Sequence, residues 1–181
     1  MSRGTLQSSR KQVAMLVVLF IFLIGYIFSP ALKSLAIGRF RNGIVRTETL
    51  ITNIPTGWLT SVQSTAITAW KPTWTVFSAE PSAIISISTP VWIPEDIGLW
   101  EKAWISTVVE RGYREKPAQV VEGKAGSFHC IEAVDTKNYN RSICSCIATG
   151  PRISAGFDGV RSELGSFYAV IRRTRNIESK E

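Results

Sequence analysis

The stretch "GSFHCIEAVDTKNYNRSICSCIATG", residues 126–150, contains all three cysteines of the chain and its single histidine. Two runs rich in apolar and β-branched residues flank the polar segment "TKNYN", a pattern typical of two strands joined by a turn. Side chains of a strand alternate between its two faces, so His129 and Cys130 should point to opposite faces. Without a bulge, these two residues cannot pair as nucleophile and base or ligate one metal ion.

The three cysteines are disulfide candidates. Cys144 and Cys146 share one face of the second predicted strand, and pairing the isoleucine-rich faces places Cys130 opposite one of them. The sequence leaves that choice open. Outside the cytoplasm such a pair oxidises, and a bond that closes about fifteen residues stabilises the fold by roughly 3 kcal/mol. The third cysteine is then a buried thiol or bonds to a partner chain.

Other chemistry for this segment is less well supported. A zinc site with three cysteines and His129 has enough ligands, but the spacing C-x13-C-x-C lacks a C-x2-C knuckle. A redox or catalytic thiol stays open as an alternative. The segment "EGKAGS", residues 122–127, does not match a phosphate-binding loop, and no G-x-S-x-G elbow is present. We therefore expect no catalytic residues, no metal ion and no cofactor.

The N-terminal segment "KQVAMLVVLFIFLIGYIFSP" has sixteen uncharged residues from Val13 to Phe28. This run spans about 24 Å as a helix, and its flanks extend it towards the roughly 30 Å of a bilayer core. We predict a basic N-tail at 1–11, an uncleaved transmembrane signal anchor at 12–32 and a basic linker at 33–46. The alternative is a signal peptide cleaved after Ala36, a poor site because of Lys33.

The positive charge lies at the ends of the chain. The net charge is +7, yet residues 47–171 hold ten Lys or Arg against twelve Asp or Glu, a net of −2. Nucleic-acid-binding domains carry their excess as a basic stripe, whereas this distribution suits a membrane surface. We expect no nucleic-acid partner, and a single-pass protein of the inner membrane with its domain on the extracytoplasmic side. The candidate membrane-surface contacts are Lys33, Arg39, Arg41, Arg172 and Arg173.

Two helices are expected in a chain otherwise rich in short strands. "PEDIGLWEKAWISTVVERG", residues 94–112, places an apolar residue every three to four positions and ends at Gly112, a left-handed stop. Its Trp100 and Trp104 should pack against the sheet. A turn at Asp158–Gly159 should precede a second helix, whose apolar face is Val160, Leu164, Phe167 and Ile171.

This order predicts an α+β fold, an antiparallel sheet of about six or seven strands covered by two amphipathic helices and preceded by one transmembrane helix. The early turn "PTGW", residues 55–58, and the closing run "ISAGFDGVRSELGSFYAVI", residues 153–171, give the chain a resemblance to the PsbP/Mog1-like domains over about residues 48–175. We place that domain at 47–176, followed by a tail at 177–181. The resemblance implies a small non-catalytic accessory domain that binds a larger assembly, and it assigns no site residues.

The six tryptophans are the residues that bear most on function. Trp70, Trp74 and Trp92 are candidates for an interaction surface, because aromatic side chains are enriched at binding sites. Packing in the core is the alternative for these residues, which lie in strand-rich segments. We expect a membrane-anchored, non-enzymatic accessory subunit or interaction module within a larger complex or a homo-oligomer. A small-ligand or lipid-binding domain with an aromatic cleft is the first alternative. A thiol redox protein that uses the three cysteines is the second.

Overall fold

A computed structural model describes residues 13, 15–23, 25, 39–40, 43–73 and 80–177. The chain divides into two compact units, Gly38–Pro72 with Glu80–Glu181, and Met1–Ile37 with Thr73–Ala79. In the second unit, residues 15–23 are helical and their side chains are exposed. Among the described residues, no helix has both the length and the apolarity of a membrane span. Ten of the 21 residues of the predicted anchor (12, 14, 24 and 26–32), and all of the predicted N-tail, lie outside the described residues.

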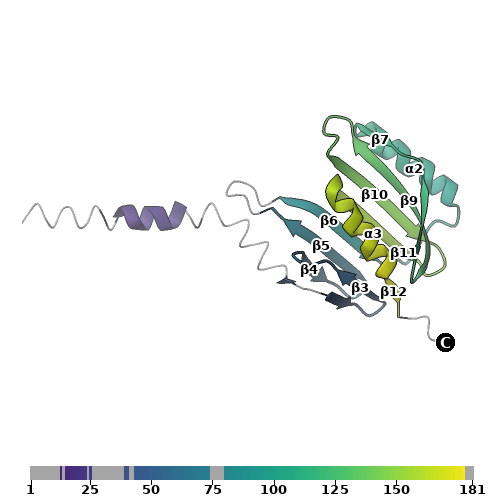
Figure 1. Ribbon diagram of the computed structural model, residues 1–181, viewed down its shortest axis with the longest axis horizontal. Coiled ribbons are helices and arrows are strands. Elements are labelled where there is room, and N and C mark those ends of the chain that lie inside the picture. Colours follow the sequence, from purple (N-terminus) through teal and green to yellow (C-terminus); the bar gives the residue numbers. More distant parts are fainter. Residues whose placement is uncertain are drawn as a thin grey trace, which may run out of the picture. The chain divides into compact units, whose positions relative to one another are not determined.

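The first unit contains a sheet of nine strands in which every pairing is antiparallel (Figure 1). One path through it runs β1-β4-β5-β6-β11-β10-β9-β7, and β8 pairs with the same edge of β9 as β7 does. The strands, in that order, are β1 (Arg39–Phe40), β4 (Leu59–Val62), β5 (Ala66–Pro72), β6 (Pro81–Ser88), β11 (Ile153–Val160), β10 (Arg141–Ala148), β9 (Gly126–Asp135), β7 (Tyr113–Glu115) and β8 (Gln119–Gly123).

A second, smaller sheet has the order β12-β3-β2 and is also antiparallel. Its strands are β12 (Arg175–Asn176), β3 (Leu50–Ile54) and β2 (Gly43–Arg46). The predicted α+β class with an antiparallel sheet is confirmed, but the predicted number of strands is too low. Short strands such as β7 and β12 have too few residues to show a periodic pattern. Strands β1 and β2 also lie inside the range that we expected to be a linker.

Helix α2 (Ile97–Glu110) begins at the N-cap Asp96, whose Oδ1 accepts a hydrogen bond from the Leu99 N–H at 3.0 Å. Gly112 has a φ of 85°, so the predicted left-handed stop is confirmed. Within α2, Val108 is the one buried residue. Trp100 and Trp104, which we predicted to pack against the sheet, are only partly buried.

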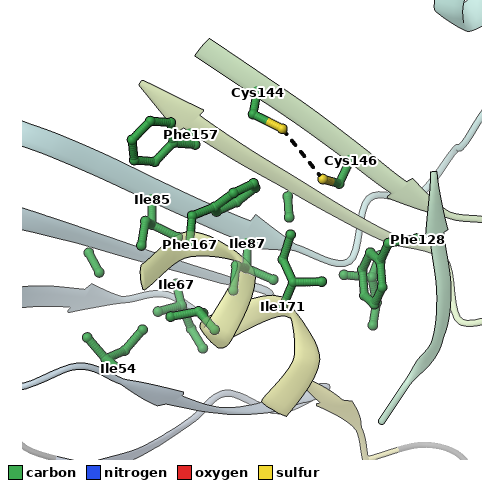
Figure 2. Close-up of a cluster of buried hydrophobic side chains, with 14 of the residues drawn as sticks. Ile54, Ile67, Ile85, Ile87, Phe128, Cys144, Cys146, Phe157, Phe167 and Ile171 are labelled. Atoms are coloured by element: carbon green, nitrogen blue, oxygen red, sulfur yellow. Dashed lines mark hydrogen bonds between the residues drawn. The ribbon is translucent and has the colours of Figure 1, made fainter. Parts of the chain in front are cut away.

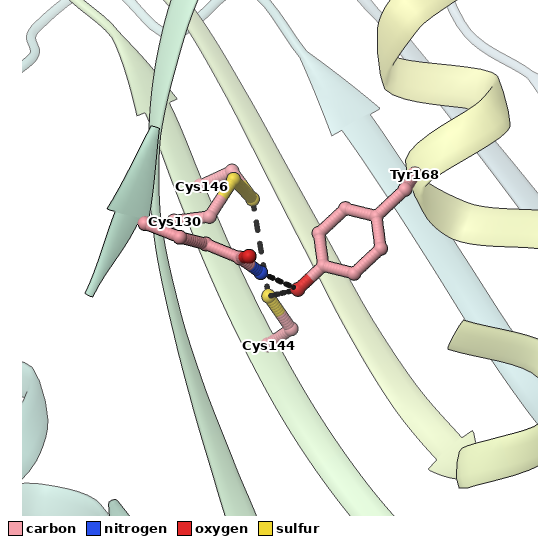
Figure 3. Close-up of a disulfide and its surroundings, with 5 residues drawn as sticks. Cys130, Cys144, Cys146 and Tyr168 are labelled. Atoms are coloured by element: carbon pink, nitrogen blue, oxygen red, sulfur yellow. Dashed lines mark hydrogen bonds between the residues drawn. A yellow bond between two sulfur atoms is a disulfide. The ribbon is translucent and has the colours of Figure 1, made fainter. Parts of the chain in front are cut away.

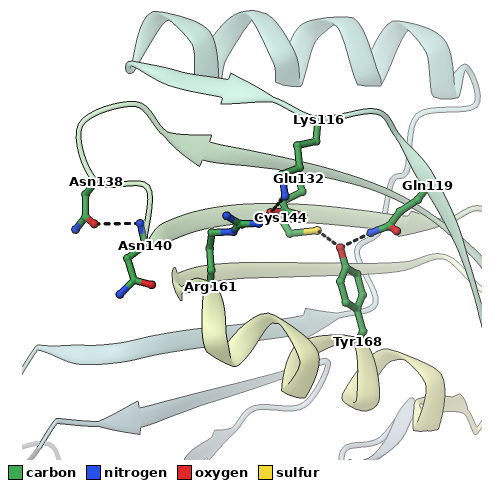
Figure 4. Close-up of polar contacts among 8 residues, drawn as sticks. All are labelled: Lys116, Gln119, Glu132, Asn138, Asn140, Cys144, Arg161 and Tyr168. Carbon is green, nitrogen blue, oxygen red and sulfur yellow. Dashed lines mark hydrogen bonds and ion pairs between the residues drawn. The ribbon is translucent and has the colours of Figure 1, made fainter.

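Helices α2 and α3 (Leu164–Arg173) lie on opposite faces of the main sheet (Figure 4). The 3₁₀ turn η1 (Arg161–Glu163) leads into α3. Figure 4 shows strands of this sheet between the two helices. Phe167, Val170 and Ile171 of α3 are buried and join one hydrophobic core with residues from both sheets. In Figure 2, Phe167 and Ile171 point from α3 towards Ile85 and Ile87 of β6. The core therefore lies around α3.

The predicted turn at Asp158–Gly159 is wrong, because both residues lie inside β11 and pair with β6. Gly159 lies directly opposite Ala83, and a Cβ atom added to it would come within 2.5 Å of the Ala83 Cα. This glycine permits a close approach of two strands and not a reversal of the chain. The helix consequently begins at Leu164, four positions later than the sequence pattern predicts.

Candidate functional site

The β9–β10 hairpin brings the three cysteines together. Cys146 lies directly opposite Cys130, and their sulfur atoms form a disulfide of 2.06 Å. This register is one of the two that the sequence leaves open. His129 lies opposite Ile147, on the other face of the hairpin. Within the described part of the chain, no group of three or more His, Cys, Asp or Glu side chains could hold a metal ion.

The third cysteine, Cys144, is a free and buried thiol. Its Sγ lies 3.9 Å from the Cys146 Sγ and 3.7 Å from the Tyr168 hydroxyl, which reaches it from α3 (Figure 3). Burial raises the pKa of the Cys144 thiol to about 12. Burial, followed by the neighbouring Cys144, also raises the pKa of Tyr168. Both groups are therefore protonated near neutral pH, and the thiol is not an activated nucleophile.

A buried carboxylate completes this region. Glu132 lies opposite Cys144 on the core-facing side of β9 and is 7% exposed. Its Oε1 is 2.8 Å from the Lys116 Nζ and 3.8 Å from the Arg161 Nε (Figure 4). The two cations compensate the buried negative charge. We call Cys130, Glu132, Cys144, Cys146 and Tyr168 the closed cluster.

Sequence reasoning missed Glu132, although a signal was present. A single carboxylate stands on the strand face that Phe128 and Cys130 make apolar, and a buried charge requires a partner. Lys116 could not be identified as that partner, because it lies 16 positions away in the loop between two unpredicted strands. Ser142, on the same face of β10, is fully buried, and its Oγ has no hydrogen-bond partner among the described residues.

The other predicted site residues are spread over the molecule. Trp70 lies in β5 opposite Leu59 and Ile84 and is partly buried. Trp92 is 73% exposed, in the connection between β6 and α2. Arg172 and Arg173 are exposed in the last turn of α3. The remaining candidates, Trp74, Lys33, Arg41 and the side chain of Arg39, lie outside the described residues.

An open hollow of about 350 Å³ lies beside Trp92. The β6–α2 connection forms one side of it and the β10–β11 turn forms the other. Val91, which is 96% exposed, contributes to the rim. The charged groups that line it are Glu95 and Arg152. We call this hollow the Trp92 pocket; its lining residues are Val91, Trp92, Ile93, Pro94, Glu95, Ile97, Thr149 and Arg152.

A second hollow of about 270 Å³ lies on the face of the sheet that α2 partly covers. Trp104 forms one wall, and Ile84 of β6 and Ile143 of β10 contribute to the lining. Gly156 is also part of the lining, and a Cβ atom there would come within 2.9 Å of the Ser86 Oγ. Helix α2 therefore leaves part of this sheet face uncovered.

No protein-family model matches the chain, and no curated protein sequence is significantly similar to it. The candidate functions are therefore compared on the structure, in which the closed cluster is largely buried and the rim of the Trp92 pocket is exposed.

Proposed function

We propose that this chain is a membrane-tethered, non-enzymatic accessory subunit whose folded unit binds a partner protein on the extracytoplasmic side. The exposure of Val91 and Trp92, 96% and 73%, carries the proposal. The two residues are consecutive, have no regular secondary structure around them and form the rim of a hollow. Large aromatic side chains at the centre of an interface supply much of its binding energy.

The state of the reactive groups supports binding over catalysis. Cys144 is 2% exposed, and burial raises the pKa of its thiol to about 12. A catalytic cysteine needs a thiolate that the substrate can reach. Neither condition is met at Cys144. The thiol redox alternative would require α3 to move, because Tyr168 of that helix contacts the thiol.

The pairing of Cys130 with Cys146 supports the extracytoplasmic location. Disulfides persist in oxidising compartments and are rare in the cytosol. The apolar run from Val13 to Phe28 supports the tether, and the exposed Arg172 and Arg173 suit a position close to anionic lipid. The expected resemblance to PsbP/Mog1-like domains points to the same class of accessory protein.

Copurification tests this function directly. The full-length protein is extracted with a mild detergent and compared with Trp92→Ala and with Tyr139→Ala. Tyr139 is a matched control, because it is also an exposed aromatic residue, 62% exposed in the β9–β10 turn. We expect a stoichiometric partner with the wild type and with Tyr139→Ala, and its loss with Trp92→Ala. A wild-type protein that elutes only as a free monomer would contradict the proposal.

A second candidate function, small-ligand binding, is favoured by the Trp92 pocket itself. Its volume of about 350 Å³ is within the usual range for small-molecule sites.

A further inference from the structure

We propose that the Trp92 pocket binds a free α-amino acid with an apolar side chain. Three features of the described residues carry this inference: two opposite charges without ion-pair partners, an apolar wall and an arginine whose backbone is held in a turn. The volume of about 350 Å³ accommodates a ligand of roughly ten non-hydrogen atoms. This site lies at the proposed partner-binding surface, but binding of a free amino acid requires no partner protein.

The two charged side chains of the pocket are the first feature. Glu95 and Arg152 line the same hollow, and neither takes part in an ion pair within the described part of the chain. The neighbouring Asp96 is already occupied, because its Oδ1 caps α2. A ligand with one ammonium and one carboxylate group can satisfy both charges through charge-assisted hydrogen bonds. A ligand with a single charge satisfies only one.

The apolar wall is the second feature. Val91, Trp92, Ile93 and Ile97 line the hollow next to the charged pair. An aliphatic or aromatic side chain placed against them removes apolar surface from water on both partners. A polar side chain gains nothing from this wall. The combination therefore selects residues such as leucine or phenylalanine over serine or aspartate.

The backbone at Arg152 is the third feature. Its φ is 50°, and it is the single non-glycine residue with positive φ among those described. The turn is held from both sides, since the Arg152 N–H donates to the Thr149 carbonyl at 3.4 Å and the Asn176 Nδ2 donates to the Pro151 carbonyl at 3.2 Å. Left-handed non-glycine residues persist where their surroundings fix them, and they cluster at ligand sites. Arg152 is thus presented to the pocket by a preorganised turn.

Calorimetric titration of the full-length protein in mild detergent tests the proposal with L-leucine and L-phenylalanine as probes. N-acetyl-L-leucine lacks the ammonium group, and L-leucinamide lacks the carboxylate. We expect each analogue to bind about tenfold more weakly than leucine, because each loses the charge-assisted hydrogen bonds to one of the two pocket charges. The analogues also mimic the two ends of a polypeptide. If either binds as tightly as leucine, the ligand is a chain end and the proposal fails.

Variants assign the binding to the pocket. Glu95→Gln and Arg152→Gln should each weaken leucine binding about tenfold, and the matched exposed controls Glu110→Gln and Arg114→Gln should not change it. Glu95→Gln should leave the affinity for N-acetyl-leucine unchanged, since that ligand has no ammonium group. Circular dichroism confirms that each variant is folded.

Two results overturn the proposal. One is the absence of heat for both probes up to about 10 mM, where even a millimolar site would be filled. The other is leucine binding that survives in both pocket variants. Either result leaves the partner-protein function standing if copurification still depends on Trp92. A wild-type protein that binds leucine but elutes only as a free monomer would contradict the partner proposal alone.

Discussion

The closed cluster and the Trp92 pocket differ both in the reactivity of their residues and in their exposure to solvent. The closed cluster holds the reactive groups of the β9–β10 hairpin, a thiol, a disulfide and a carboxylate, but α3 packs over the thiol and burial keeps it protonated. The Trp92 pocket has ordinary residue types, but they are exposed and its two charges are without ion-pair partners among the described residues. Residue chemistry alone would have selected the first region, whereas accessibility selects the second.

This difference gives the two regions separate effects under mutation. Changes in the closed cluster should alter the free energy of unfolding and leave binding intact. Changes at the pocket should weaken binding and leave the free energy of unfolding almost unchanged. Four variants, from the largest expected effect on stability to the smallest, test that separation.

The largest loss of stability is expected from Cys130→Ala combined with Cys146→Ala. The bond between these residues spans a sequence separation of 16, and its removal should lower the free energy of unfolding by about 3 kcal/mol in the chain-entropy model. Urea unfolding monitored by fluorescence measures this. Leucine affinity of the folded double variant should equal that of the wild type. A parallel loss of affinity would show that the two regions are coupled.

Gly159→Ala should cost about 1–3 kcal/mol, because overpacking forces the neighbouring backbone to move. The added Cβ would lie 2.5 Å from both the Cα and the Cβ of Ala83. Gly150→Ala is the matched control, since a Cβ there meets no atom within 4 Å. The two free energies of unfolding, compared with that of the wild type, decide the point. Equal values for the two variants would show that β6 and β11 are less closely packed than described.

The buried thiol should make stability depend on alkaline pH. The pKa of Cys144 rises from an ordinary 9.0 to about 12 on folding, so above pH 9 the unfolded chain binds fewer protons than the folded one. Stability is therefore fully present below pH 9 and is lost as pH rises towards 12, by about 1 kcal/mol at pH 10. Unfolding free energies at pH 8, 9 and 10 test this, with brief unfolding to prevent thiol exchange. Cys144→Ala should show a shallower decline, and identical slopes would mean that the thiol is accessible to water.

The smallest effect on stability is expected from Trp92→Ala, within about 0.5 kcal/mol of the wild type, because the side chain is 73% exposed. The same substitution should abolish copurification of the partner. Thermal unfolding and copurification on one preparation measure both properties. A large loss of stability would place Trp92 in the fold and remove the contrast between the two regions.

Features that depend on neighbouring residues could be predicted from the sequence. Alternation along the first strand of the hairpin separates His129 from Cys130, and Gly112 marks the end of α2. The disulfide partner could not be chosen, because a shift of two residues keeps every side chain on the same face. Cys144 and Cys146 are therefore equivalent in the pattern, and only the observed register distinguishes them.

Features that depend on distant segments could not be predicted. The pair Asp158–Gly159 has the composition of a turn, but contact with β6 at Ala83 keeps it in a strand. The Trp92 pocket combines a connection near residue 92 with a turn near residue 152, and no local pattern links the two. Trp100 and Trp104 fit the apolar face of a helix, yet the sheet leaves them partly uncovered. Burial by distant segments decides such cases, and a periodic pattern in the sequence gives no information about those segments.

The disulfide across the β9–β10 hairpin also has a mechanical consequence. Pulling the two ends of the chain apart places every segment between them under tension. Because Cys130 and Cys146 are joined, the loop between them cannot lengthen when the strands are pulled apart. The oxidised chain therefore stops about 50 Å short of its reduced length when fully stretched.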